Sequence, residues 1–175
     1  MTTITKRWLL NGLLLLIVLA LFWFISQQLN SKGVIVNTLY DASMGNEIVS
    51  IVINREKTKL KVSPKIELKK VSGQWMMVSP IKSKVDSRKI KHLMTLLSDE
   101  ISASYSVVGK NLSAFGLENN RVSIAFNGVK IQFGSLNPIS YKRYVRKGDT
   151  IYMVDETVHG LLLSGVDHFI QETVN

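Results

Sequence analysis

Hydrophobic residues gather in one long run near the start of the chain and in short alternating segments after it. No charged residue occurs between Trp8 and Ser31, and positions 8–25 are almost continuously Leu, Ile, Val, Phe and Trp. At 1.5 Å per residue, a helix of roughly 18 such positions is about 27 Å long, close to the hydrocarbon thickness of a bilayer. The pattern predicts a transmembrane anchor at residues 8–28.

The flanks of this run predict that the anchor is kept and in which direction it crosses the membrane. A cleavable signal peptide has a shorter apolar region, about 7 to 15 residues, followed by small residues at the cleavage site. Here the run is followed by SQQLN at positions 26–30. Lys6 and Arg7 favour a cytoplasmic tail at 1–7, and Lys32 on the other side weakens this asymmetry without reversing it. We therefore expect a single-pass membrane protein with its C-terminal part outside the cytoplasm.

The rest of the chain divides into a juxtamembrane connector at 29–46 and a periplasmic domain at 47–175. From Glu47 onward the apolar residues alternate, with Val49, Ile51 and Ile53 on one face of a predicted strand. The next segment alternates as strictly and places Lys57, Lys59 and Lys61 on one side before Pro64 ends it. Both segments are typical of half-buried strands.

Three turn sequences predict β-hairpins in this domain. They are Ser72-Gly73, Asn127-Gly128 and Lys147-Gly148-Asp149. Asn-Gly favours a two-residue type I′ turn, which fixes the register of the flanking strands. The predicted cross-strand pairs are Phe126 with Val129, Ile124 with Ile131, and Val122 with Phe133. We expect this apolar face, together with Trp75, to form the core.

Helices are predicted after two of the hairpins. Asp86 is a candidate N-cap for a helix with apolar residues at 90, 93, 94, 97 and 101, and one or two short helices are expected at 156–163 and 166–174. Segments 65–80 with 87–101 and 141–154 with 157–170 then form two hairpin-plus-helix units. The predicted fold class is α+β: a single N-terminal transmembrane helix followed by a mostly antiparallel, hairpin-rich domain.

The composition of the chain excludes some kinds of functional site. The chain has 175 residues, no Cys and a net charge of +9, so disulfides, thiolate nucleophiles and Cys-ligated metals are excluded. Without Lys6 and Arg7, 20 basic residues face 13 acidic ones, an excess of +7. Outside the cytoplasm, anionic lipid headgroups or an acidic partner are better candidates for such a surface than nucleic acid. Solubility alone also explains the excess.

Residues with catalytic or metal-binding chemistry form no known motif. The sequence lacks a G-x-S-x-G, an S-x-x-K and a phosphate-binding Gly loop. His159 and His168, with Asp155 or Asp167, have the spacing of no zinc motif, so we expect solvated histidines. Asp155 and Glu156 have an ordinary role as helix N-cap residues. We expect no enzyme activity, no metal and no cofactor.

Two sets of residues are candidates for an interaction surface. The first is the lysine row Lys57, Lys59 and Lys61, which is otherwise a solvated or edge-protecting face. The second lies on the hairpin at 141–154 and consists of Tyr141, Arg143, Tyr144 and Arg146. Aromatic and basic side chains together can bind a ligand or partner, although aromatic residues on strands are more often half-buried cross-strand neighbours.

The order of these motifs resembles bacterial domain-of-unknown-function family 4340. The resemblance rests on an I-x-I strand, L-K-K-x-x-G-x-W-x-x-x-x-P at 68–80, the helix after Asp86 with its LMTLL core, F-G-L at 115–117, and R-Y-V-R-x-G-D-x-I-Y-M-V at 143–154. It covers nearly the whole outer domain. The chain departs from the family in being short and in having Asn120 where a Pro often follows F-G-L. The resemblance implies a membrane-anchored extracytoplasmic α+β protein, in some members an auxiliary component of transport or gliding-motility machinery, with no established catalytic residues.

These observations lead to one functional hypothesis and two alternatives. The hypothesis is a membrane-anchored, non-catalytic periplasmic interaction module that acts as an accessory subunit of a larger inner-membrane complex. The alternatives are a periplasmic domain that binds a glycan, lipid or small ligand, and a hydrolase with an unrecognised site. A deep pocket lined by aromatic residues would favour the former alternative, and convergent buried acids or histidines would favour the latter.

Overall fold

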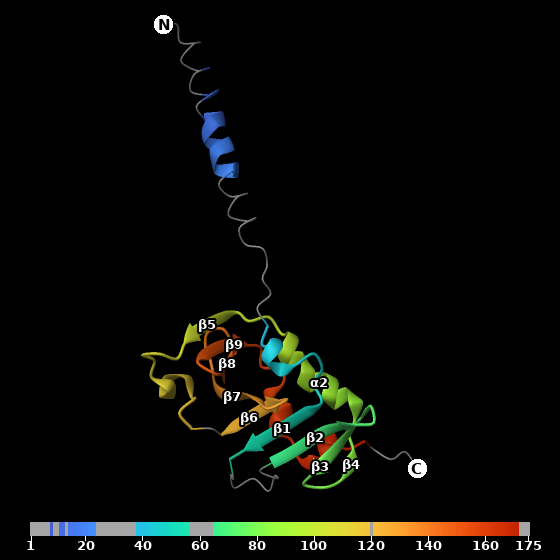
Figure 1. The fold of residues 1–175 in the computed structure, drawn as a ribbon. Helices are drawn as coiled ribbons and strands as arrows, with labels where there is room; N and C mark the ends of the chain where they lie inside the picture. Colours follow the sequence, from blue (N-terminus) through green and yellow to red (C-terminus); the bar gives the residue numbers. More distant parts are fainter. Residues whose placement is uncertain are drawn as a thin grey trace. The chain divides into compact units, whose positions relative to one another are not determined.

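A computed structural model describes residues 8, 11–12, 14–23, 38–56, 65–119 and 121–171 (Figure 1). The chain divides into two units, Met1–Val36 and Asn37–Asn175. In the first unit, the described residues are helical and their side chains are exposed. None of the helices within the described ranges is both long enough and apolar enough to span a membrane. The predicted anchor at 8–28 lies partly outside the described residues. The lysine row at 57–61 lies wholly outside them.

The second unit is α+β and is built on a nine-stranded antiparallel sheet, counted over the described residues (Figure 1). The strand order is β4-β3-β2-β1-β6-β7-β8-β9-β5. The strands are β1 (Ser50–Arg55), β2 (Lys65–Val71), β3 (Gln74–Ser79), β4 (Ser83–Lys84), β5 (Ala103–Ser106), β6 (Val122–Phe126), β7 (Val129–Leu136), β8 (Arg143–Lys147) and β9 (Thr150–Val154). The fold class predicted for this domain is therefore confirmed at this level.

All three predicted hairpins are present. The β6–β7 register pairs Phe126 with Val129, Ile124 with Ile131 and Val122 with Phe133, as predicted from the turn. Asn127 and Gly128 both have positive φ, as a type I′ turn requires. Turns at Ser72-Gly73 and Gly148-Asp149 connect β2 to β3 and β8 to β9.

The core lies on one face of the sheet, under α2 (Ser87–Ser98) and α3 (His159–Leu163). Asp86 caps α2 by accepting a hydrogen bond from the Arg88 backbone N–H at 2.8 Å, which confirms the predicted N-cap. Trp75 and Val129, predicted as core, are half-buried and pack against its edge. The fully buried large side chains include Phe126, Phe169, Leu39, Met44, Ile51, Ile53, Ile66, Leu68, Met77, Leu93, Leu96 and Ile124.

Part of the predicted connector belongs to this core. Leu39 and Met44 are fully buried, and a short 3₁₀ helix, η1, occupies Ala42–Met44. Lys147 fixes this segment to the β8–β9 hairpin, because its Nζ lies 2.6 Å from both the Leu39 carbonyl oxygen and Asp41 Oδ2. The Asn127 side chain joins the end of this N-terminal segment, Met44 to Ser50, to the β6–β7 turn.

The C-terminal part differs in detail from the prediction. Glu156 does not cap a helix: α3 begins at His159, its N-cap position is Val158, and that residue makes no side-chain capping bond. The reason is that the Glu156 carboxylate binds Arg143 on β8. A 3₁₀ helix, η3 (Val166–Phe169), follows the break at Gly165. Strand β5 was not predicted, since Ala-Ser-Tyr-Ser has no hydrophobic alternation.

Candidate functional site

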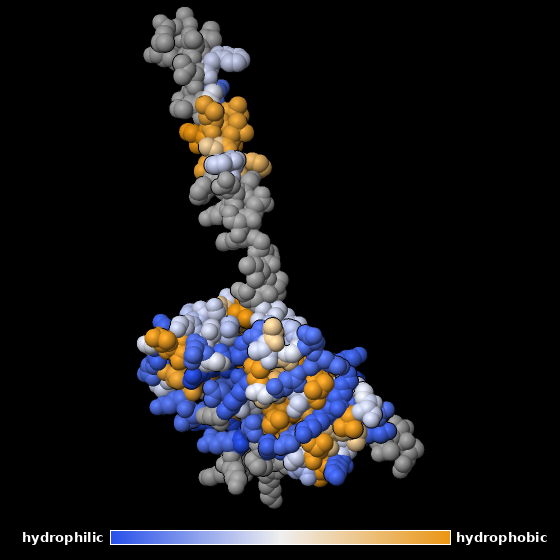
Figure 2. Space-filling model, in the orientation of Figure 1, coloured by the Kyte–Doolittle hydropathy of each residue, from blue (hydrophilic) through white to orange (hydrophobic). Residues whose placement is uncertain are grey.

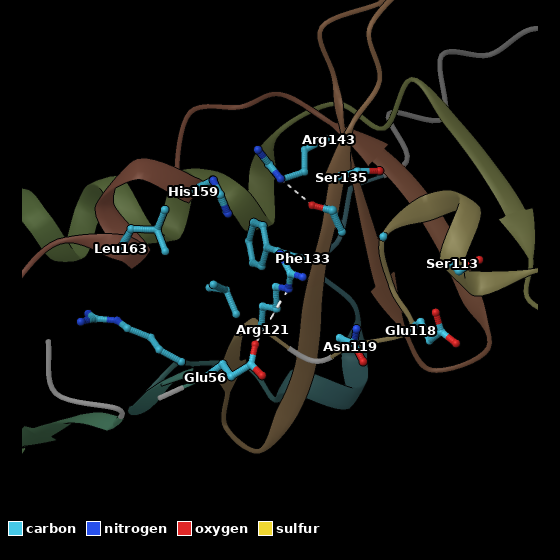
Figure 3. A pocket seen from close by; sticks show the side chains of 14 residues that line it. Glu56, Ser113, Glu118, Asn119, Arg121, Phe133, Ser135, Arg143, His159 and Leu163 are labelled. Atoms are coloured by element: carbon cyan, nitrogen blue, oxygen red, sulfur yellow. Dashed lines mark hydrogen bonds and ion pairs between the residues drawn. The ribbon is translucent and has the colours of Figure 1, made fainter. Parts of the chain in front are cut away.

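A pocket lined by described residues opens where β1, β6 and β7 end beside α3. Its volume is about 780 Å³, within the range of small-molecule sites. Figure 3 shows His159 and Leu163 of α3 on one side, Phe133 in the middle, and Ser113, Glu118 and Asn119 on the other. The lining is completed by Arg55, Glu56, Gly116, Arg121, Val122, Gly134, Ser135 and Arg143.

Arg143 is held in the pocket wall by several hydrogen bonds. Its side chain is only 12% exposed, and its guanidinium binds both carboxylate oxygens of Glu156, with Nη2 lying 2.7 Å from Oε1. Nη1 donates to the Gly134 carbonyl oxygen of β7. A planar, bidentate pair of this kind fixes orientation as well as charge. Arg143 thereby joins β8, β7 and the segment before α3.

His159 continues this network into the pocket. Its ring stacks on Phe133, with centroids 5.8 Å apart, and Nδ1 lies 3.2 Å from Glu156 Oε1. Burial lowers the pKa of His159 below its usual 6.5; the nearby Arg143 charge lowers it further, and Glu156 opposes both. The neutral imidazole therefore predominates at neutral pH. The side chain is 18% exposed, so the expectation of solvated histidines was wrong for His159.

Three further charged residues of the pocket lining lie at the strand ends. Arg55 is the last residue of β1 and is 8% exposed, and burial lowers the pKa of its guanidinium. Arg121 points toward Glu56, with Nε 3.9 Å from Oε2, and both side chains are largely exposed (Figure 3). Exposed pairs of this length contribute little to stability. They do place one cation and one anion at the mouth of the pocket.

Two glycines set the wall between β7 and η2 (Leu112–Phe115). A Cβ at Gly134 would lie 2.2 Å from the Phe115 carbonyl oxygen, and a Cβ at Gly116 would lie 2.7 Å from the Ser135 backbone nitrogen. Gly116 also has φ +66, the left-handed conformation that ends η2. Any larger residue at either position would push η2 away from the sheet.

The groups that line this pocket can make polar and aromatic contacts with a ligand. Across the described ranges, no three His, Cys, Asp or Glu side chains come together in a way that could hold a metal ion. The lining combines an aromatic wall with charges of both signs. Such a surface suits a small polar ligand with an apolar part.

The residues predicted as an interaction surface are not all brought together. Lys57, Lys59 and Lys61 lie outside the described residues. Arg143 is in the pocket wall, whereas Tyr144 packs edge-on against Phe115 at 5.0 Å between centroids and receives a hydrogen bond from Asn137. Tyr141 is 73% exposed on the loop between β7 and β8. Arg146 lies near the other end of β8, where it donates to the Gly148 carbonyl oxygen.

Sequence reasoning did not predict the roles of Arg55 and His159 in the pocket lining or of Glu156, which binds Arg143. The local sequence gave no sign of two of these roles. Arg55 had such a sign: it occupies the inward position that follows Ile51 and Ile53 in the alternation of β1. Glu156 and His159 meet Arg143 only through folding, and no spacing in the sequence indicates that contact.

A shallower groove lies between α2 and the β2–β3 hairpin. Its volume is about 490 Å³, and Trp75, Met94 and Ile90 provide its apolar floor. Lys70 and Glu47 lie on its rim, 2.5 Å apart.

Comparison with known proteins adds no further assignment: no family model, no curated protein and no solved structure matches the chain.

Proposed function

We propose that the chain is a membrane-anchored, non-catalytic interaction module of the bacterial inner membrane. A single N-terminal transmembrane helix holds the α+β domain in the periplasm, where it serves as an accessory subunit of a larger membrane complex in transport or envelope machinery. The observation that carries this proposal is the division of the chain into an uncharged apolar segment and a separate unit with its own core.

The first unit supports the anchor. Among its described residues, Leu14 to Val18 and Leu21 to Trp23 are apolar and at least half exposed on a helix. A helix that presents large apolar side chains on every face requires an apolar environment. Hydrocarbon supplies that environment and water does not.

The pocket supports a module without catalysis. Arg143, a largely buried cation of the pocket wall, is bound by Glu156 and Gly134, so it holds the fold together at this point. His159 is held against Phe133 and Glu156. These contacts explain the charged residues by packing and orientation, with no reacting group required.

The pocket also favours a second candidate function, a periplasmic domain that binds a small ligand. Its volume of about 780 Å³ and its Phe133–His159 wall provide room and one flat apolar surface. Leu163→Trp would fill the entrance beside α3. If the domain binds a small ligand, this variant should no longer bind it, while the membrane complex stays intact.

Gentle detergent extraction of the full-length chain, followed by crosslinking and mass spectrometry of the co-purified proteins, tests the interaction module. We expect one set of membrane proteins to co-purify at constant stoichiometry. Neutral variants at Lys57, Lys59 and Lys61, and separately Tyr141→Ala, test whether either predicted surface contributes. Extraction of a free monomer with no specific companion under crosslinking would contradict the proposal.

A further inference from the structure

A dense group of cations lies where the sheet ends at β4 and α2 begins. Within ten residues there are five basic side chains and one acid, Asp86. We call the five the basic rim: Lys82, Lys84, Arg88, Lys89 and Lys91. Three of the lysines are exposed, the fourth is half-exposed, and Arg88 has an 89% exposed side chain. Figure 2 shows hydrophilic residues beside apolar patches over this end of the domain.

The backbone beneath the basic rim is fixed on both sides. Ser83 and Lys84 pair with Met77 and Met76 of β3. On the outer side, the Lys84 carbonyl oxygen accepts from the Gln171 N–H at 3.1 Å, and the Asp86 N–H donates to the Phe169 carbonyl oxygen at 2.9 Å. Val85 between them is buried. The positions of these cations are therefore set by the fold, while their long side chains remain free to adapt.

Among the described residues, few acidic side chains belong to the segments that carry or adjoin the basic rim. Asp86 is occupied by the backbone and guanidinium of Arg88, with Oδ2 2.8 Å from Nη2. The first turn of α2 contains no acidic residue, although acids are favoured there and cations are unfavourable. Asp167, two residues before Phe169, is the acidic residue of η3. Five cations with so few counter-charges repel one another, and an external anion relieves that repulsion.

The composition of the basic rim distinguishes a lipid surface from a protein partner. Protein interfaces are depleted in lysine and enriched in aromatic residues and arginine, whereas the rim has four lysines and one arginine. Lysine clusters are typical of anionic phospholipid recognition. Ile81, directly before the rim, is a 47% exposed aliphatic side chain. Cations beside an exposed apolar residue match the charge and the apolar boundary of a membrane surface.

The anchor would bring that surface within reach. Between the end of the predicted anchor at 28 and the start of the second unit at 37, the chain has eight residues. Fully extended, they span at most about 29 Å. The domain is thus confined near the headgroup layer, where even weak contacts form because the local lipid concentration is high.

We propose that the basic rim binds the phosphate headgroups of anionic phospholipids and so sets which side of the domain faces the membrane. This inference rests on the proposed anchoring. It gives the domain a second membrane contact that leaves the pocket and the β5 edge of the sheet for other partners.

Lysine modification in nanodiscs tests the proposal residue by residue. The full-length chain is reconstituted in nanodiscs of phosphatidylcholine alone or of phosphatidylcholine with phosphatidylglycerol, and lysine acetylation is followed by mass spectrometry. We expect Lys82, Lys84 and Lys91 to react at least about threefold more slowly in the anionic discs, and the protection to disappear at high salt. Lys130 is the internal reference, because it lies on β7, five strands from β4.

A matched pair of variants separates the basic rim from the total charge. Lys82→Gln with Lys84→Gln removes two rim charges, and Lys110→Gln with Lys130→Gln removes two exposed charges elsewhere. In flotation with phosphatidylglycerol vesicles, the rim variant should lose affinity by about fivefold per lysine, and the control should keep it. All four lysines are exposed, so neither double variant should change folding much.

The outcomes distinguish this inference from the anchoring proposal. A chain that fails to enter nanodiscs contradicts the anchor, and vesicle flotation then decides lipid binding separately. Equal modification in the two kinds of disc overturns the lipid proposal while leaving the anchor intact. Protection of the rim that appears only with a co-purified protein assigns the surface to that partner and likewise overturns it.

Discussion

Removal of the Asn127 side chain should detach the N-terminal segment of the domain from the sheet. Its Nδ2 donates to the carbonyl oxygens of Met44 at 2.6 Å and Glu47 at 2.7 Å. Its Oδ1 accepts from the backbone N–H groups of Val49 and Ser50, both at 3.0 Å. One side chain in a hairpin turn therefore satisfies four backbone groups of another segment.

The magnitude follows from these four bonds. Each contributes about 0.5 to 1.5 kcal/mol net, and partial rehydration of the exposed ones reduces the sum. Asn127→Gly removes all four and keeps the turn, because Asn127 has φ +47, which glycine adopts freely. We expect a loss of about 2 to 4 kcal/mol, a large part of the stability of a domain this size. Asn127→Asp should cost more, since its second oxygen would face two carbonyl oxygens.

Urea unfolding of the full-length chain in mild detergent, followed by circular dichroism, measures this loss. Asn119→Gly is the control, an exposed loop residue whose side chain makes no hydrogen bond within the described ranges. It should change the midpoint little. If Asn127→Gly costs no more than Asn119→Gly, the four bonds do not hold the segment, and the reasoning is refuted.

Three further predictions concern the pocket wall, the core and pH. Gly134→Ala should cost about 1 to 3 kcal/mol by pushing η2 off β7, whereas Gly160→Ala, where a Cβ meets nothing within 4 Å, should not; equal melting of the two would contradict the close approach. Ile124→Ala should cost about 2 to 5 kcal/mol in thermal unfolding, because Ile124 is fully buried; an unchanged melting temperature would reverse the assigned face. The pKa of His159 in the folded state lies below its usual 6.5, so folding favours the neutral ring. The stability that this ring contributes is fully present above pH 6.5 and is lost as the pH falls through the folded-state pKa. His159→Gln should flatten that part of a stability–pH curve, and an unchanged slope would contradict it.

The hairpins could be predicted because their determinants are local. Asn127-Gly128 selects one turn type, the turn fixes the register, and the register decides which side chains face the core. The N-cap Asp86 could be predicted for the same reason, since a capping residue acts within the first turn of its own helix. In each case the interacting groups lie within a few residues of one another.

The pocket and the attachment of the segment at Met44 to Ser50 could not be predicted, because their contacts join distant parts of the chain. The Arg143–Glu156 pair spans 13 positions, and the Asn127 bonds to Met44 and Glu47 span 83 and 80. Local propensity assigned Glu156 to a helix start, and the tertiary contact with Arg143 took precedence. Strand β5 shows the same limit: its Ala-Ser-Tyr-Ser sequence forms a strand because β9 pairs with it.

Accessibility of single cysteines in intact cells tests the central claim, a kept anchor with the domain outside the cytoplasm, most directly. The chain has no cysteine, so one introduced thiol gives an unambiguous label. Ser140→Cys places it on an exposed loop of the domain, and Thr3→Cys places it in the predicted cytoplasmic tail. With a membrane-impermeant maleimide that crosses only the outer membrane, we expect Ser140→Cys to be labelled in intact cells, in a membrane-bound chain of full mass. Thr3→Cys should react only after the inner membrane is opened. The reverse pattern, or a labelled domain that is soluble and lacks its first thirty or so residues, would contradict the account.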